Sequence, residues 1–263
     1  MKYLIKIFTL ITSFVKSIKI NYPIAKNTWF GSGGKTSIFF EAQSIISLKF
    51  FLSLLPINIP IFTIGMGSNI LIRDGGIRGV TIKLKGNFNK IIIDKSNKIL
   101  KVGSGVKNID LAKFCEVNNI GGFEFLIGIP GSVGGSVKMN AGCFKQSISD
   151  LITKITVIDR LGKIHTINKE KKNFSYRKTE IPNQYIIIDS TFNIKKKSRT
   201  LIKNKMNPSP PDPERVALHR RWDALGGPHP KYVRGRGAAH RQEAQPRYRL
   251  QARVARQVRS PSA

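Results

Sequence analysis

The sequence is poor in cysteine, in acidic residues and in long apolar runs. Its 263 residues include only two cysteines, which excludes a disulfide-stapled scaffold and a four-cysteine zinc site. No apolar run reaches the roughly 20 residues that a membrane-spanning helix needs. The nearest case, Ile7 to Val15, has lysines on both sides and no small-residue cleavage site after it. We therefore expect an amphipathic helix over residues 1–20, no membrane partner, no metal site and a cytoplasmic location.

The shortage of acidic residues leaves a strongly basic chain. Forty-five Lys and Arg face 15 Asp and Glu, which gives a formal net charge of +30. Such a charge makes nucleic acid a candidate partner. However, the lysines are scattered, and the arginine-rich end offers only Tyr232 and Tyr248 for base stacking. We expect no specific nucleic-acid partner, and a basic nucleic-acid-binding protein acting through its tail stays the alternative from another functional class.

The basic residues change type along the chain. Residues 1–206 contain 28 Lys and 5 Arg, whereas residues 207–263 contain 1 Lys, 11 Arg and 8 Pro. The first part uses residues with AT-rich codons and the second uses residues with GC-rich codons, which favours a join to foreign coding sequence over evolution of a basic tail. We predict that residues 201–263 form a largely disordered Arg/Pro/Ala-rich tail in place of a further domain.

The body of the chain predicts an α+β fold in two subdomains. Helical apolar spacing predicts helices at 41–54 and 107–118. Short β-branched runs separated by glycine predict strands at 61–64, 70–72, 80–84, 90–94, 99–102, 152–158, 163–167 and 185–194. We expect one domain over residues 21–200, with subdomains of about 21–90 and 91–200 that meet near Phe88 to Lys98.

Two short glycine clusters could bind an anion. Gly65-Met66-Gly67-Ser68-Asn69 follows a predicted strand, and its small residues let backbone N–H groups turn inward around phosphate oxygens. A strand is expected after it and a third glycine is missing, so it is not the doubly wound dinucleotide fingerprint. The alternative is a plain hairpin turn. Gly103-Ser104-Gly105 precedes a predicted helix and is open to the same two interpretations.

A third glycine-rich stretch, from Gly121 to Gly142, is more informative. Its glycines, its proline and its scarcity of charge make it a poor core element. It is also too long for a simple connection between subdomains. A backbone wall that a flat or phosphorylated ligand approaches closely is the better interpretation.

This stretch resembles the signature of the bacterial UDP-N-acetylenolpyruvoylglucosamine reductases, or UDP-N-acetylmuramate dehydrogenases. Other motifs of that family appear in the family's order, and the resemblance runs from about Asn21 to Ile194. They are Asn27-Thr28-Trp29-Phe30 with Gly33-Gly34, then Gly65 to Asn69 with Leu71 to Gly79, and Phe174-Ser175-Tyr176-Arg177, which is similar to the Phe-x-Tyr-Arg motif of the family.

The resemblance implies a fold, a reaction and two cofactors. The fold would be the two-subdomain FAD-binding type shared with p-cresol methylhydroxylase and vanillyl-alcohol oxidase. The family transfers a hydride from NADPH through FAD to UDP-N-acetylglucosamine enolpyruvate, which yields UDP-N-acetylmuramate. The chain would thus be a monomeric cytoplasmic flavoprotein oxidoreductase of peptidoglycan synthesis, and so of cell wall biogenesis, cell shape and cell division.

The resemblance also implies roles for particular residues. Arg177 would be the catalytic cation that holds the substrate carboxylate or enolate, because its planar fork is a bidentate donor that lysine cannot replace. Tyr176 would line the substrate pocket, with a core tyrosine as the alternative. The FAD contacts, mostly through backbone, would be Gly65, Met66, Gly67, Ser68, Asn69, Ile129, Gly131, Ser132, Gly134, Gly135 and Asn140.

The chain departs from the family pattern in two places. Gly31 stands where the family usually has a basic residue. After Lys205 the motifs that carry the proton-donor serine and the late glutamate of the family are missing, so these two roles are assigned to no residue. We expect flavin binding without efficient turnover, and a non-catalytic FAD-binding fragment is the alternative to the complete reductase.

Overall fold

The computed structural model describes residues 12, 14–170 and 174–207 of the chain. The predicted tail is wrong over residues 201–206, which belong to a helix with Ile202 and Met206 buried. The tail from residue 208 onward and most of the predicted N-terminal helix lie outside the described residues. Within the range expected to be helical, residues 14–16 are helical and a strand begins at Ile18. In the described residues, no helix is long and apolar enough to cross a membrane.

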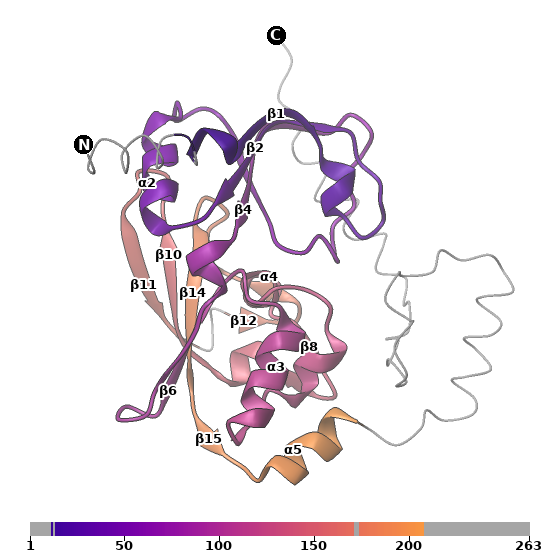
Figure 1. The fold of residues 1–263 in the computed structure, drawn as a ribbon, viewed down its shortest axis with the longest axis vertical. Coiled ribbons are helices and arrows are strands. Elements are labelled where there is room, and N and C mark those ends of the chain that lie inside the picture. The colour runs from indigo at the N-terminus through magenta and orange to yellow at the C-terminus, as the bar shows by residue number, and fades with distance from the viewer. Residues whose placement is uncertain (1–11, 13, 171–173, 208–263) are drawn as a thin grey trace, which may run out of the picture. The chain divides into compact units, whose positions relative to one another are not determined.

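The first half of the described chain forms a four-stranded sheet with the order β1-β2-β4-β3. The strands are β1 (Ile18–Pro23), β2 (Lys35–Ala42), β3 (Ile61–Ile64) and β4 (Ile77–Leu84). Strands β1 and β2 are antiparallel, whereas β4 is parallel to both β2 and β3. The 3₁₀ helix η1 (Ile24–Asn27) joins β1 to β2, and helix α2 (Ile45–Leu54) joins β2 to β3 (Figure 1).

Helix α2 confirms the predicted first helix from Ile45 onward. Ser44 caps it, because its Oγ accepts a hydrogen bond from the amide of Ser47 at 3.1 Å. Residues 41 and 42, predicted as helix, belong to β2 instead. The inner face of α2 is buried, and the Phe51 ring stacks on Phe40 of β2 with 4.0 Å between the ring centroids.

The second half forms a five-stranded antiparallel sheet with the order β11-β10-β14-β6-β5. The strands are β5 (Ile91–Asp94), β6 (Ile99–Gly103), β10 (Ile152–Ile158), β11 (Ile164–Asn168) and β14 (Ile186–Asn193). All five were predicted to within two residues. The first sheet ends at Leu84, and the 3₁₀ helix η2 (Gly86–Asn89) leads into β5.

Short helices and strand pairs occupy the segments between β6 and β10 and around β14. The helices are α3 (Asn108–Val117), η3 (Glu124–Gly128), α4 (Val133–Lys138), η4 (Ile148–Asp150) and α5 (Arg199–Met206). The pairs are β7 (Ile120–Gly121) with β15 (Lys195–Lys196), β8 (Gly142–Cys143) with β9 (Gln146–Ser147), and β12 (Phe174–Ser175) with β13 (Lys178–Thr179).

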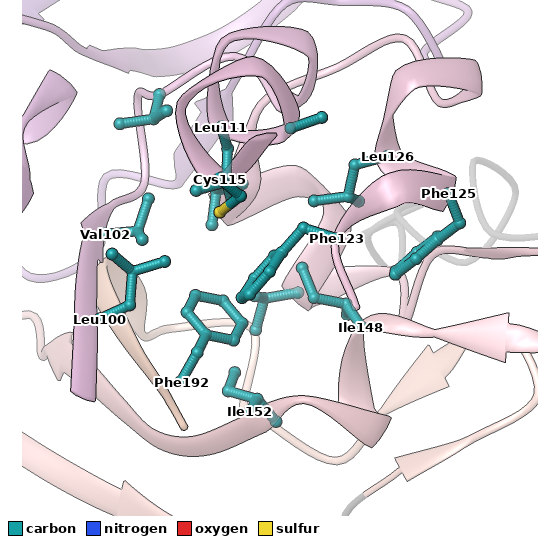
Figure 2. Close-up of a cluster of buried hydrophobic side chains, with 14 of the residues drawn as sticks. Leu100, Val102, Leu111, Cys115, Phe123, Phe125, Leu126, Ile148, Ile152 and Phe192 are labelled. Carbon is teal, nitrogen blue, oxygen red and sulfur yellow. The ribbon is translucent and has the colours of Figure 1, made fainter. Parts of the chain in front are cut away.

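Two large apolar clusters hold these elements together. In the first, Phe123 meets Phe192 edge to face, with 5.3 Å between ring centroids, below helix α3 (Figure 2). Cys115 lies in this cluster, and its burial raises the pKa of the thiol, so it is an unreactive core residue. The second cluster joins the two sheets, because Ile158, Ile186 and Ile188 pack with residues of β2, β4 and α2.

The predicted strand at residues 70–72 is wrong. These residues form a loop between β3 and β4 and pair with no strand of the described sheets. Their apolar character serves packing instead, since Ile72 is buried in a small cluster with Ile24, Phe39 and Ile64. The mixture of helices with one mixed and one antiparallel sheet confirms the α+β class.

Candidate functional site

The three glycine clusters, far apart in the sequence, come together in the fold. The Ser68 hydroxyl donates to the carbonyl of Pro130 at 2.8 Å. The amide of Asn108 donates to Gly131 O at 3.0 Å, and the amide of Gly134 donates to Ser104 O at 3.0 Å. We call residues 65–69, 103–105 and 129–135 together the glycine cradle.

The first loop of the cradle presents unused hydrogen-bond donors. Within the described part of the chain, the amides of Met66, Gly67, Ser68 and Asn69 donate to no protein acceptor. Backbone N–H groups in a folded protein are nearly always paired, with protein, water or ligand. Successive free amides at the end of a strand form a concavity suited to phosphate oxygens.

Glycine is required in this loop by close backbone approach. Gly67 has φ of +69°, and a Cβ there would lie 1.9 Å from the carbonyl oxygen of Asn27. The amide of Trp29 donates to Gly67 O at 3.0 Å, so the segment after η1 holds the loop in place. A Cβ at Gly65 would lie 2.4 Å from Ser132 Oγ, which brings the third cluster against the first.

The second cluster is structural. Cβ atoms at Gly103 and Gly105 would lie 2.1 Å from Phe88 O and from Asn89 Oδ1 respectively. These glycines let the turn pack against η2, and Ser104 O then accepts the amide of Gly134. This turn therefore positions the third cluster.

Asn108, at the start of α3, fixes the third cluster and was missed in the sequence. Its Nδ2 donates to Ile129 O at 3.0 Å and to Ser136 Oγ at 2.7 Å, and the residue is fully buried. Its Oδ1 has no partner among the described residues. A polar residue at the start of a helix that directly follows a glycine turn is the signal that could have identified it.

The third cluster exposes backbone on one side. A Cβ at Gly128 would meet nothing within 4 Å, and at Gly135 the nearest atom would be Ser132 Oγ at 3.6 Å. The amides of Ile129 and Gly134 are already used by Leu126 O and Ser104 O. Any ligand contact at these two residues would therefore involve atoms other than the amide hydrogen.

The hairpin that carries Tyr176 and Arg177 is tied to the end of α4. Asn140 Nδ2 donates to Ser175 O at 2.9 Å, and Thr179 Oγ1 donates to Lys138 O at 3.0 Å. Lys138 Nζ in turn donates to Ile181 O at 2.5 Å. Burial lowers the pKa of Lys138, an effect that Glu180 partly opposes.

Arg177 lies in the two-residue turn of this hairpin, with φ of +58°. Its guanidinium carbon lies 5.5 Å from the centroid of the Tyr176 ring. The Nε atom of Arg177 is buried and lacks a hydrogen-bond partner among the described residues. Tyr176 is 78% exposed, so the core-tyrosine interpretation is wrong.

A buried ion pair fixes the chain just before the third cluster, and it too was missed in the sequence. Glu124 is buried, accepts from the amide of Gly122 at 2.7 Å and pairs with Lys197 Nζ at 2.9 Å. Burial opposes ionisation of Glu124, but hydrogen bonds from its own backbone, Lys197 and Gly122 hold its pKa below the usual 4.5. The pair joins η3 to the segment that follows β14.

Comparison with known proteins shows which family model and which proteins this chain resembles. The family described as "FAD binding domain" matches residues 48–168. The UDP-N-acetylenolpyruvoylglucosamine reductase of Rickettsia felis is 45% identical over 190 residues, which is 72% of this chain and 63% of that protein. The corresponding protein of Orientia tsutsugamushi is 43% identical over 173 residues, 65% of this chain and 57% of that protein.

A solved structure agrees with these sequence matches. The UDP-N-acetylenolpyruvylglucosamine reductase of Thermus caldophilus superposes with a TM-score of 0.63 and 26% identity, over 81% of this chain and 71% of that one. The chain spans somewhat less than two thirds of the length of the curated relatives described above. With its glycine cradle and tethered arginine hairpin, the described domain is similar to the UDP-N-acetylenolpyruvoylglucosamine reductases and has an FAD-binding fold.

Proposed function

We propose that this chain binds FAD in the glycine cradle and contributes that site to the NADPH-dependent reduction of UDP-N-acetylglucosamine enolpyruvate. The observation that carries the proposal is the convergence of three glycine clusters, with four amides of the first loop lacking protein acceptors among the described residues. Together with the matches to the reductases, this arrangement supports a flavin site over a plain hairpin turn.

The residues present fit the group that the family uses. The free amides of Met66, Gly67, Ser68 and Asn69 would hold the pyrophosphate. The backbone of the half-buried Gly131 and the exposed Gly135 would form a wall against which the flat ring system lies, with the buried Ser132 beneath it. Asn140 keeps its side chain on Ser175 O and Ser149 N, at 2.9 and 3.3 Å, and would act on the flavin mainly by placing the hairpin.

When bound, FAD supplies a hydride acceptor for NADPH and a hydride donor for the enolpyruvyl double bond. This chain supplies a cation for the negative charge of the substrate. Arg177, in a turn fixed through Ser175 and Thr179 to the end of α4, would hold the carboxylate or enolate oxygen with its planar donors. Tyr176, exposed beside it, would contact the same ligand.

The experiment is to purify the full chain and record its visible absorption, then follow NADPH oxidation with and without the enolpyruvyl substrate. We expect a yellow protein that retains FAD. We also expect inefficient turnover. Slow substrate-dependent NADPH oxidation would support the FAD-binding fragment, and rapid oxidation would support the complete reductase. A colourless protein that takes up no added FAD would contradict both.

A matched pair of variants separates binding from chemistry. Arg177→Lys keeps the charge but loses the bidentate fork, and we expect it to leave FAD binding unchanged. Gly67→Ala places a Cβ against Asn27 O and should weaken FAD binding itself. Loss of FAD from both variants equally would mean that Arg177 supports the fold and not the substrate.

A further inference from the structure

Asn27, the last residue of η1, lies against the first loop of the glycine cradle. Its carbonyl oxygen is the atom that a Cβ at Gly67 would meet first. Two residues later, the amide of Trp29 donates to Gly67 O at 3.0 Å. The segment from Asn27 to Trp29 therefore holds the loop whose amides would bind the pyrophosphate, and whatever fixes Asn27 also fixes those amides.

The side chain of Asn27 is bound from two sides. Its Nδ2 donates to Tyr22 Oη of β1 at 3.2 Å, and its Oδ1 accepts from Lys83 Nζ of β4 at 2.7 Å. Because an ammonium group has donors and no acceptor, Oδ1 and not Nδ2 must face Lys83. A hydrogen bond from a charged donor is roughly twice as strong as one between neutral groups. Lys83 therefore supplies the stronger of the two bonds.

Lys83 lies where strand β4 passes the start of the loop. It is the register partner of Ile64, the last residue of the parallel strand β3. The first loop of the cradle begins at the next residue, Gly65. This register places Lys83 beside the loop without making it part of the loop.

The carboxylate nearest to Lys83 is engaged by other lysines. Glu41 pairs with Lys85 at 2.5 Å and with Lys19 at 3.6 Å. Among the described residues, the only hydrogen-bond partner of Lys83 Nζ is Asn27. Burial and the charges of Lys85 and Lys19 lower the pKa of Lys83, an effect that Glu41 opposes. A half-buried ammonium group is costly, and the contact that its position secures is the one with Asn27.

We propose that Lys83 is a positioning residue for FAD, which through Asn27 holds the first loop of the cradle in the conformation that binds the pyrophosphate. The identity of the ligand rests on the proposed function, whereas the chain of contacts from Lys83 through Asn27 to Gly67 does not. The alternative is that the charge of Lys83 acts directly on the phosphates. The experiments below separate the two.

The first test compares two charge-matched variants of the full chain. Lys83→Met and Lys85→Met each remove one positive charge at the same end of β4, but Lys85 pairs with Glu41 and not with Asn27. We expect Lys83→Met to weaken FAD binding at least about tenfold and to leave the affinity for riboflavin, which lacks the pyrophosphate, unchanged. Lys85→Met should alter FAD affinity by no more than about twofold. Equal weakening of FAD binding by both variants would overturn the proposal.

A double-mutant cycle with Asn27→Ala shows whether Lys83 acts through Asn27. In the Asn27→Ala background, Lys83→Met should have no further effect on FAD affinity, because the contact is already lost. A second loss of about tenfold in that background would assign the charge of Lys83 to the phosphates and refute the positioning role. The same holds if the difference between Lys83→Met and the unmodified chain disappears at high salt.

Amide hydrogen exchange tests the positioning without any flavin. Exchange of the Trp29 amide, which donates to Gly67 O, reports whether the segment still holds the loop. We expect it to be at least about tenfold faster in Lys83→Met than in the unmodified chain or in Lys85→Met. An unchanged rate, or an equal acceleration at the amides of β10, would contradict the proposal. If the unmodified chain binds no FAD but Trp29 exchanges faster in Lys83→Met, the proposed function fails and the positioning role of Lys83 stands.

Discussion

The close approach of Gly67 to the segment after η1 makes a graded prediction about the first loop of the cradle. A new Cβ can strain a backbone with positive φ, and it can collide with neighbouring atoms. Three glycines differ in these two effects. Gly75 has a Cβ position with nothing within 4 Å and no positive φ; Gly31 has free space but φ of +63°; Gly67 has φ of +69° and a Cβ position 1.9 Å from Asn27 O. Alanine substitution at the three sites separates backbone strain from collision.

The expected magnitudes follow from this geometry. Gly75→Ala should leave stability unchanged or raise it by up to about 1 kcal/mol, since alanine reduces the entropy of the unfolded chain. Gly31→Ala should cost about 1 kcal/mol, the cost of the left-handed conformation less that gain. Gly67→Ala should cost more than about 3 kcal/mol, because the obstacle is backbone and the loop must move.

The assay is urea unfolding followed by far-ultraviolet circular dichroism, combined with FAD titration of each folded variant. We expect affinity for FAD to fall at least about tenfold for Gly67→Ala, a change of about 1.4 kcal/mol, and to stay unchanged for Gly75→Ala. If Gly67→Ala were no less stable than Gly31→Ala, the contact between this loop and Asn27 would not exist as described, and the reasoning would fail.

Three further changes test the hairpin and the buried ion pair. Arg177→Lys should lower any substrate-dependent NADPH oxidation by about 10²–10³-fold, and an unchanged rate would remove Arg177 from the chemistry. Asn140→Asp loses the donor to Ser175 O and should lower the free energy of unfolding, measured in urea, by about 1–3 kcal/mol. An unchanged free energy of unfolding would mean that this hydrogen bond does not hold the hairpin. Glu124→Gln should cost about 1–3 kcal/mol at neutral pH. Because the pKa of Glu124 is depressed in the fold, that difference should shrink as the pH falls below about 4.5, and a difference that grows in acid would contradict the assignment.

Local patterns predicted the second sheet well. Strands β10 and β14 are runs of β-branched residues bounded by turns. They pair with each other, and they are similar in residue pattern and in length. The first sheet was harder to predict. Strands β1 and β2 were missed, because Ile18–Pro23 continues an apolar N-terminal segment and Lys35–Ala42 adjoins the capped helix α2 without a glycine between them.

The residues of the candidate site were easier to predict than the residues that hold them in place. Glycine clusters signal backbone that approaches something closely, and three of them were identified in the sequence. Their convergence depends on contacts between distant residues, such as Ser68 with Pro130 and Gly134 with Ser104. No spacing in the sequence encodes such contacts. For the same reason Asn108 and the Glu124–Lys197 pair became visible only in the fold.

The most direct test of the central claim is to titrate the purified full chain with FAD and with riboflavin, which lacks the pyrophosphate. Because the free amides of the first loop would hold the pyrophosphate, we predict one FAD per chain, bound much more tightly than riboflavin. Equal affinity for the two flavins, or no binding of either, would contradict it.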